Sequence, residues 1–265
     1  MIKKHRRKRQ HQLDMAIAAI QHRYGPSILV RGGTPRANIL TATIPHIPTG
    51  FPPLDRALGI GGLPKGQVCE ITGPATSGKT TLALKFLAQA QADGGQVAYI
   101  DQALYFDPDY AHRCHIDLSR LLIGRPRDLG EALAMAEALA LNGSLAALVL
   151  DTLDFLWTDP IPASLLAATL NRLPAPLARS GTILLVLHES PVGGVNPWRN
   201  SPALSTLAHC ATVRLSVVRE RWIHSHNDIR GYEASVQVLK NRRAPAGRKV
   251  TIAIEFNGTV RGNGL

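Results

Sequence analysis

The sequence predicts an α/β fold with a mostly parallel central sheet, helices on both of its faces and an antiparallel C-terminal extension. From Ile39 onward, apolar strand-like segments alternate with helix-like segments, which is the pattern of a parallel sheet covered by helices. A glycine-rich loop joins one of these strands directly to a helix. In the last third of the chain, strand-like segments follow one another with only turns between them. In an open sheet of this kind, ligands are expected at the carboxyl ends of the parallel strands.

The predicted core spans residues 38–265. Its parallel strands are predicted at residues 67–72, 97–101, 121–123, 145–150 and 182–187. The helices between them are predicted at residues 78–92, 108–114, 128–141 and 163–179. A loop rich in Gly, Pro, Ser and Asn follows at residues 189–206. Antiparallel strands are then predicted at residues 213–219, 233–240 and 250–256, the last two joined by a turn around residues 244–247.

The start of the chain differs from this core. Residues 1–10 are strongly basic and are predicted to be a disordered tail. Apolar residues then recur at helical spacing, which predicts a short amphipathic helix over residues 11–24, and a single short strand is predicted at residues 28–30. A helix and a strand of this size cannot enclose a core of their own. Residues 11–37 are therefore expected to pack on the rest of the chain or on a neighbouring subunit.

Composition narrows the class of protein. The 265 residues include 30 Lys and Arg against 19 Asp and Glu, giving a net charge of +11, which indicates a polyanionic partner such as nucleic acid or an anionic membrane surface. The apolar runs are too short to span a bilayer, and no apolar segment of a secretory signal follows the basic start. Three widely spaced cysteines form neither a metal site nor a disulfide framework, so an intracellular, cytoplasmic protein with reduced thiols is expected: Cys69, Cys114 and Cys210.

The glycine-rich loop carries the clearest chemistry in the sequence. It fits the phosphate-binding motif G-x-x-x-x-G-K-[ST] with Gly73, Pro74, Ala75, Thr76, Ser77, Gly78, Lys79 and Thr80. Glycines let the backbone N–H groups wrap around phosphate oxygens, and the following helix adds the positive end of its dipole. Lys79 is expected to reach the β- and γ-phosphates, and the Thr80 hydroxyl is expected to bind Mg²⁺.

A second acidic position follows from the strand at residues 145–150. This strand is apolar throughout and ends at Asp151, as in the Walker B pattern of phosphate-binding-loop proteins. Asp151 would then hold Mg²⁺ directly or through water. The alternative interpretation is an ordinary aspartate at a strand end that caps the next segment; the complete loop at residues 73–80 favours the metal role.

Segments outside the loop carry a more specific likeness: Leu58–Gly66, Tyr99–Asp101, Asp107–Ala111, Asp117–Leu122, Val213–Leu215 and Val238–Asn241. Together they resemble the bacterial RecA recombinase family over nearly the whole chain from about residue 11. The resemblance implies a RecA-like P-loop NTPase core that binds ATP and Mg²⁺, and a compact, divergent member that ends at Leu265 without the family's C-terminal domain. It also implies that residues 11–37 are the element by which one subunit docks on the next in a filament.

The same resemblance assigns residues to the nucleotide. Asp107 and Tyr110 match positions that hold the adenine, the tyrosine by stacking, and Phe256 matches an aromatic residue that closes the base pocket. Thr81 follows the loop and is included among the nucleotide-binding residues. Lys240 and Arg242 match cations that reach the ATP phosphates of a neighbouring subunit, in the manner of an arginine finger. From the residues alone, without the resemblance, the preferred interpretation of these two cations is a solvated edge strand that carries charges for solubility.

The loop at residues 189–206 matches the family's second DNA-binding loop. Its residues suit that task, because glycines expose backbone N–H groups, an arginine adds charge and a tryptophan stacks on bases: Gly193, Gly194, Asn196, Trp198, Arg199 and Asn200. The alternative interpretation is a mobile surface loop. The implied partners are single-stranded DNA, double-stranded DNA and further copies of the chain, with no membrane.

The sequence departs from the family pattern where ATP would be hydrolysed. Ala103 stands where the family has the glutamate that positions the attacking water, so no side chain there can accept a proton. His188 and Glu189 stand where the family has an Asn-Gln pair that senses the γ-phosphate; a glutamate there is repelled by triphosphate unless a cation intervenes, and it can also supply the missing base. The first DNA-binding loop of the family is missing, since residues 157–162 lead directly into the next helix.

Three functions are consistent with these residues. The leading hypothesis is a compact recombinase that binds ATP and single-stranded DNA and forms filaments for homologous recombination and DNA repair. It is expected to be a DNA-dependent ATPase in which Lys79, Glu189, Lys240 and Arg242 are the candidate catalytic residues and ATP acts mainly as an assembly ligand with slow turnover. The second is a non-hydrolysing accessory factor of the ImuA type that assists lesion bypass or regulates a filament, which Ala103 and Glu189 favour. A ring-forming helicase motor is the third, disfavoured by the missing base.

Overall fold

The structure is a computed structural model that describes residues 2–26, 28–29, 44–153, 160–190, 202–225 and 228–255. The chain divides into two compact units, residues 1–44 and residues 45–265. In the first unit, helix α1 spans Ile2–Tyr24. The helix predicted at residues 11–24 therefore begins earlier, and the basic stretch predicted to be disordered is helical, because lysine, arginine and glutamine are favourable helix formers. Ile28 and Leu29 form a bend where a strand was predicted.

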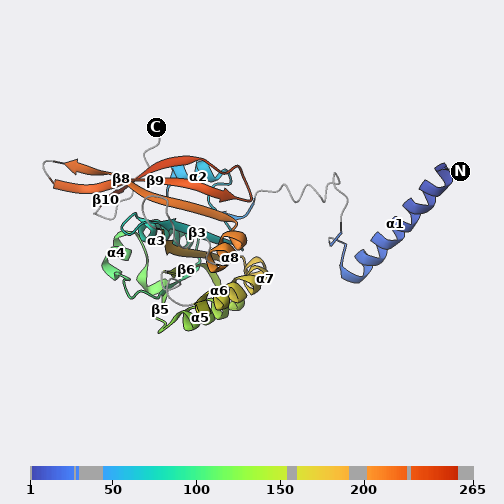
Figure 1. Cartoon of the computed structure of the whole chain (residues 1–265), viewed down its shortest axis with the longest axis horizontal. Helices are drawn as coiled ribbons and strands as arrows, with labels where there is room; N and C mark the ends of the chain where they lie inside the picture. Colours follow the sequence, from blue (N-terminus) through green and yellow to red (C-terminus); the bar gives the residue numbers. More distant parts are fainter. Residues whose placement is uncertain are drawn as a thin grey trace. The chain divides into compact units, whose positions relative to one another are not determined.

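The second unit is built on an eight-stranded sheet with the order β10-β9-β8-β3-β7-β6-β4-β5 (Figure 1). Strands β8, β3, β7, β6, β4 and β5 are parallel, and β9 and β10 are antiparallel to their neighbours. The strands span Val68–Gly73 (β3), Gln96–Asp101 (β4), Leu121–Gly124 (β5), Leu145–Asp151 (β6), Ile183–Glu189 (β7), Val213–Ser225 (β8), Asp228–Asn241 (β9) and Lys249–Glu255 (β10). A small separate sheet pairs His46–Ile47 (β1) with Leu63–Pro64 (β2).

Helices cover both faces of this sheet, as predicted. They span Pro52–Leu58 (α2), Lys79–Ala92 (α3), Pro108–Arg113 (α4), Leu129–Asn142 (α5), Pro160–Arg172 (α6), Pro174–Ser180 (α7) and Pro202–Cys210 (α8), with a 3₁₀ turn at Leu118–Arg120 (η2). One core joins the sheet to α2, α3 and α4, and a second core joins it to α5, α6, α7 and α8. Successive residues of a strand enter opposite cores, Val149 the first and Leu150 the second, because strand side chains alternate between faces.

The described elements differ from the sequence prediction in a few places. The helix predicted at residues 163–179 is two helices separated at Leu173, because Pro174 cannot continue the hydrogen-bonding pattern of α6. Helix α8 begins inside the predicted loop at residues 189–206 and extends beyond it to Cys210; it starts at Pro202, a residue that suits a first helical position.

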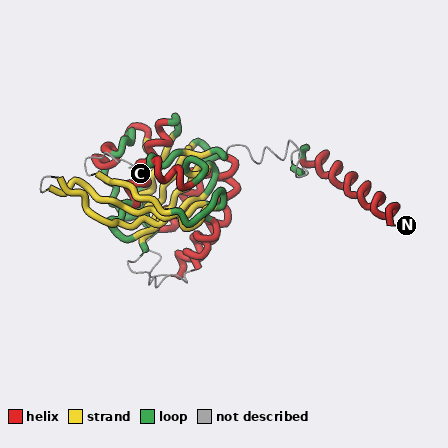
Figure 2. The backbone as a smooth tube through the Cα atoms, turned by 90° about the horizontal axis from the view of Figure 1, so that it is seen from above, coloured by secondary structure: helices red, strands yellow, loops and turns green. Residues whose placement is uncertain are grey.

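Strands β8 and β9 are longer than predicted. They run on beyond the rest of the sheet as a two-stranded ribbon (Figures 1 and 2). Among the helices that the structure describes, α1 included, none combines the length and the apolar character that crossing a membrane requires.

Candidate nucleotide-binding site

The phosphate-binding motif forms the turn between β3 and α3. Gly78 precedes the first residue of α3 at a positive φ of 102°, and Thr76 also has a positive φ, of 57°. A Cβ atom on Gly73 would lie 2.1 Å from the Val217 carbonyl oxygen, and one on Gly78 would lie 2.5 Å from Ile254 Cδ1. Glycine is therefore required at Gly73 by close contact with the backbone of β8, and at Gly78 by its backbone conformation.

The interior of the loop is suited to an anion. Lys79 Nζ donates hydrogen bonds to the Gly73 and Pro74 carbonyl oxygens at 2.8 and 2.7 Å, so the ammonium group is held inside the loop. Ser77 Oγ is buried and, among the buried side-chain atoms of the described residues, it alone lacks a hydrogen-bond partner. Such a group is costly unless it is paired. A phosphate oxygen at the start of α3 would supply that partner, so these residues fit a nucleotide.

Thr80 and Asp151 come together at the carboxyl edge of the sheet. Thr80 Oγ1 donates to Asp151 Oδ2 at 3.3 Å, so the two residues predicted to bind Mg²⁺ from distant parts of the sequence are neighbours. A hydroxyl and a carboxylate are oxygen ligands of the kind Mg²⁺ takes, together with phosphate and water. No group of three or more His, Cys, Asp or Glu side chains suited to a metal occurs in the part of the chain that the structure describes. The pair therefore fits Mg²⁺ held jointly with a nucleotide.

Tyr99 is a member of this cluster that sequence reasoning did not assign. Its hydroxyl donates to the same Oδ2 atom of Asp151. Burial, followed by the neighbouring Asp151, raises the pKa of Tyr99 far above its usual range, so the hydroxyl stays protonated and acts as a donor. The signal in the sequence was a polar hydroxyl between the apolar residues Ala98 and Ile100 of β4.

Tyr110 and Asp107 belong to the start of α4, and Tyr110 contacts the first turn of α3. Tyr110 OH and Thr81 Oγ1 are 2.7 Å apart, which fixes the tyrosine ring beside the first turn of α3. Burial raises the pKa of Tyr110 to about 12. Asp107 Oδ1 accepts from the Asp109 and Tyr110 backbone N–H groups at 2.9 and 3.1 Å, so Asp107 is the N-cap of α4 and orients Tyr110. This cap is a structural role that the sequence analysis did not assign to Asp107.

A second tyrosine was missed by the sequence analysis. The Tyr232 hydroxyl lies 3.0 Å from the point where a Cβ atom on Gly78 would be, so β9 places this ring against the end of the loop. Trp222 packs edge-on against Tyr232 at 5.9 Å, and the Arg219 guanidinium lies over the Trp222 ring at 4.3 Å. Only the pairing of β8 with β9 brings these residues together. Phe256, predicted to close the base pocket, lies outside the described residues.

The candidate base Glu189 ends β7 and is paired with Gly73, the first residue of the loop. The Ser190 N–H also donates to the Gly73 carbonyl at 3.1 Å, so this segment adjoins the loop directly. Ala103 lies in the turn after β4, whose shape is fixed by Asp101: its carboxylate accepts from the Tyr105 and Phe106 N–H groups at 3.0 and 3.1 Å. The backbone arrangement therefore brings Glu189 to the phosphate loop.

Lys240 and Arg242 are held elsewhere in the same chain. Lys240 Nζ donates to the Ala208 and His209 carbonyl oxygens at 2.6 and 3.0 Å, and Arg242 also donates to His209. The two cations thus satisfy carbonyl groups at the C-terminal end of α8, where positive charge is favourable.

The predicted DNA-binding residues lie outside the described residues: Gly193, Gly194, Asn196, Trp198, Arg199 and Asn200.

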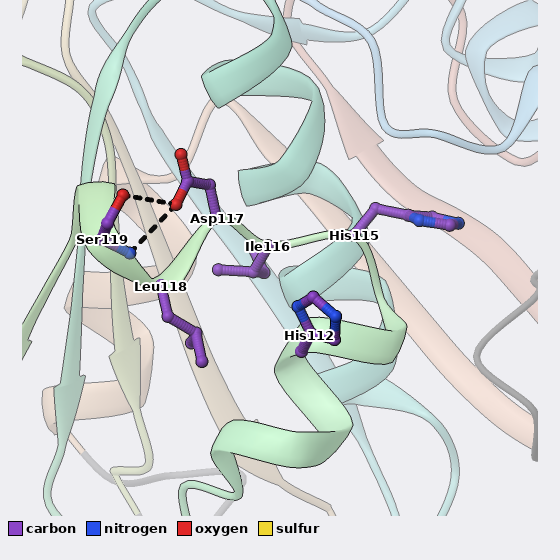
Figure 3. Close-up of a pocket in the computed structure, with 6 residues that line it drawn as sticks. All are labelled: His112, His115, Ile116, Asp117, Leu118 and Ser119. Atoms are coloured by element: carbon purple, nitrogen blue, oxygen red, sulfur yellow. Dashed lines mark hydrogen bonds between the residues drawn. The ribbon is translucent and has the colours of Figure 1, made fainter.

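A hollow of about 550 Å³ lies between α4 and η2 and is lined by His112, His115, Ile116, Asp117, Leu118 and Ser119 (Figure 3). None of these is a predicted site residue. The Asp117 carboxylate accepts from the Ser119 backbone N–H at 3.0 Å and from its hydroxyl at 2.6 Å, so it caps η2. None of the residues that line this hollow belongs to the phosphate loop, so we treat the two as separate features.

Comparisons with known proteins agree with this arrangement. A family model described as the RecA N-terminal domain matches residues 11–159. Protein RecA of Brucella anthropi is 34% identical over 268 residues, covering 95% of this chain and 73% of that protein. Protein RecA of Bacillus subtilis is 32% identical over 264 residues, covering 94% and 74%. A crystal structure of the RadB recombinase has the same fold, with a TM-score of 0.66 at 21% identity over 82% of this chain and 100% of that chain. Since these matches extend over most of this chain and of its relatives, the chain belongs to the RecA family.

Proposed function

We propose that this protein is a recombinase that binds ATP together with Mg²⁺ and assembles on single-stranded DNA. The observation that carries the proposal is the loop itself: a buried Ser77 hydroxyl without a partner in the described structure, the Lys79 ammonium group held by two carbonyl oxygens of the loop, and the Thr80–Asp151 pair. These groups supply donors and a cation for phosphates and oxygen ligands for a divalent metal. Family membership supports the same substrate class.

Each side chain has a defined task in this proposal. The N–H groups of the loop and of the first turn of α3 bind the phosphates, with Lys79 transferring its hydrogen bonds from the loop carbonyls to phosphate oxygens. Thr80 and Asp151 would hold Mg²⁺, which neutralises phosphate charge when bound. Tyr110 offers its ring to the base, and its bond to Thr81 keeps that ring in place.

Hydrolysis is proposed to be slow. Ala103 offers no proton acceptor, and the Asp101 carboxylate beside it is engaged by backbone N–H groups and by Arg125, 3.8 Å away. Glu189 is the carboxylate that adjoins the loop through the β7–β3 pairing, so we assign it as the general base. ATP then serves mainly to stabilise the assembled form.

Assembly is proposed to involve Lys240 and Arg242 acting on the phosphates of a neighbouring copy. A cation supplied by a second subunit stabilises negative charge on the transferred phosphoryl group. DNA contact is proposed for residues 193–200, supported by the surplus of basic residues that gives the chain its net charge of +11. Single-stranded and double-stranded DNA share the phosphate backbone that such a surface would bind.

The first experiment measures binding of a fluorescent ATP analogue to the full chain and to Lys79→Ala. Removing hydrogen bonds from a charged group is expected to weaken binding about 10- to 100-fold. Lys65→Ala is the matched control, because Lys65 is a surface lysine paired with Asp93 at 3.5 Å. Equal affinity of K79A and the wild type would contradict the nucleotide site.

The second experiment concerns assembly and turnover. Electron microscopy with ATP and single-stranded DNA is expected to show helical filaments; discrete particles would favour a regulatory accessory protein.

Phosphate release on single-stranded DNA is expected to be slower than that of Bacillus subtilis RecA assayed alongside. It is expected to fall further, about 100-fold, in Glu189→Gln. Glu137→Gln, at a surface pair with Arg172, is the control. A rate of phosphate release equal to that of Bacillus subtilis RecA would contradict the proposal that hydrolysis is slow.

A further inference from the structure

Tyr99 occupies an unusual position for a hydroxyl group. It lies on β4 in the interior of the sheet, is 1% exposed and packs its ring against Phe106 at a centroid distance of 5.0 Å. Phenylalanine would fill the same space. A buried hydroxyl is unfavourable unless it is hydrogen-bonded, so its presence has to be explained by its partner rather than by packing.

Strand register determines which partner it has. Tyr99 is paired with Val149 on the neighbouring β6, and Asp151 is the next residue on the same face of that strand. A long side chain that leans along its strand reaches this diagonal neighbour. The Tyr99 hydroxyl accordingly donates to Asp151 Oδ2, the oxygen that also accepts from Thr80 Oγ1 at 3.3 Å.

The arrangement places two donors on one oxygen atom of Asp151, one from the core of the sheet and one from the start of α3. Asp101 is the register partner of Asp151 across the same two strands, so two carboxylate residues occupy neighbouring positions at this edge. Asp101 is held by the Tyr105 and Phe106 N–H groups. Tyr99 holds Asp151 in a similar way. Its donated hydrogen bond fixes the Asp151 carboxylate and offsets electrostatic repulsion between Asp151 and Asp101.

We propose that Tyr99 is a positioning residue of the metal site: its hydroxyl orients Asp151 toward Thr80 and so sets the affinity for Mg²⁺ bound with nucleotide. The proposal rests on the proposed function, because it deepens the role of the same loop. Tyr99 touches neither nucleotide nor metal in this scheme and acts through Asp151. Groups that orient a metal ligand in this way typically change metal affinity or activity about 10- to 100-fold when removed.

The test uses the full chain and the variant Tyr99→Phe, which keeps the ring and removes only the hydroxyl. Binding of a fluorescent ATP analogue is titrated with MgCl₂. The Mg²⁺ concentration at half-maximal effect is expected to rise about 10- to 100-fold in Y99F, with metal-free nucleotide binding unchanged. Tyr105→Phe removes the same atom from an exposed ring of the neighbouring turn and is expected to behave as the wild type.

The outcomes separate this proposal from the nucleotide site itself. If Y99F and the wild type require the same Mg²⁺ concentration, Tyr99 does not position Asp151 and the proposal fails. It also fails if thermal unfolding shows that Y99F lowers the melting temperature equally with and without Mg²⁺-nucleotide, because the hydroxyl is then purely structural. If the wild type binds no nucleotide at all, the proposed function fails first.

Discussion

At the scale of single residues, Glu70 joins three neighbouring strands from the interior of the sheet. It lies on β3, is 1% exposed, and accepts from Arg214 Nε on β8 at 2.5 Å and from His188 Nε2 on β7 at 2.8 Å. Burial alone would raise the pKa of Glu70, but the hydrogen bonds and charges of His188 and Arg214 outweigh it and hold the pKa below the ordinary value of 4.5. Because His188 precedes Glu189, this network also anchors the segment that meets the phosphate loop.

A carboxylate with a lowered pKa contributes stability that is present above its unfolded-state pKa and is lost as pH falls through its folded-state pKa. Glu70→Gln is therefore expected to lower the free energy of unfolding by about 1–3 kcal/mol near neutral pH. The difference from the wild type should begin to shrink as the pH falls below the ordinary value of 4.5 and should be lost once the pH has fallen through the lower pKa of Glu70 in the folded protein. Urea unfolding at several pH values measures it.

Glu233→Gln is the matched control, because Glu233 also accepts two hydrogen bonds from an arginine, Arg221, but on the exposed ribbon at 2.8 Å. Exposed ion pairs contribute about 0–1 kcal/mol, so this variant should differ little from the wild type at any pH. A pH-independent loss in E70Q would show that the ionised form of Glu70 is not what stabilises the fold.

At the scale of elements, the last turn of α8 depends on two cations from β9 and the turn that follows it. Lys240 and Arg242 occupy the carbonyl groups of Ala208 and His209, and burial lowers the pKa of Lys240. Their proposed task on a neighbour's phosphates would require these bonds to break. If that proposal holds, the end of α8 and the binding of a second subunit would be linked through the same two side chains.

The double variant Lys240→Gln and Arg242→Gln is expected to loosen the C-terminal turn of α8. A cation at a helix C-terminus contributes about 0.3–1 kcal/mol, so amide hydrogen exchange there should quicken about two- to fivefold per cation removed. Nucleotide binding by the single chain should not change. Arg243→Gln is the control, since Arg243 is exposed next to Arg242. Unaltered exchange in α8 would contradict the capping role.

Elements were predicted well where local pattern decides them. The parallel strands and the helices between them lie within a few residues of the predicted positions, because strands buried on both faces read as short apolar runs and the segments between them have a helical period. Helix α8 was missed since the residues before it are rich in turn formers, and its apolar face is stabilised by packing on α6. The strand predicted at residues 28–30 is a bend at Ile28 and Leu29, where local hydrogen bonds decide the conformation: the Ile28 N–H donates to the Gly25 carbonyl at 3.3 Å, and the Gln21 side chain donates to the Leu29 carbonyl at 2.7 Å.

At the scale of the whole molecule, the net charge of +11 predicts that binding to DNA depends on salt concentration. Deleting residues 1–9 removes Lys3, Lys4, Arg6, Arg7, Lys8 and Arg9, part of the basic surplus carried by α1. The deletion is expected to weaken binding to single-stranded DNA and to reduce the slope of log affinity against log salt concentration, since fewer counterions are released. Titrations at several salt concentrations measure the slope; an unchanged slope would argue against a DNA role for this segment.

The sequence by itself determined the phosphate-binding loop, the acidic end of β6, the fold class and the resemblance to the RecA family, because each is written in contiguous residues or in a local period. Tertiary structure alone decided the strand order, which sets β6 beside β4 and brings Asp151 to Thr80 and Tyr99. It likewise placed Tyr232 against Gly78 and Lys240 on α8. These contacts join residues far apart in the chain, and the pairing of strands that creates them depends on the packing of the whole sheet, which no local pattern encodes.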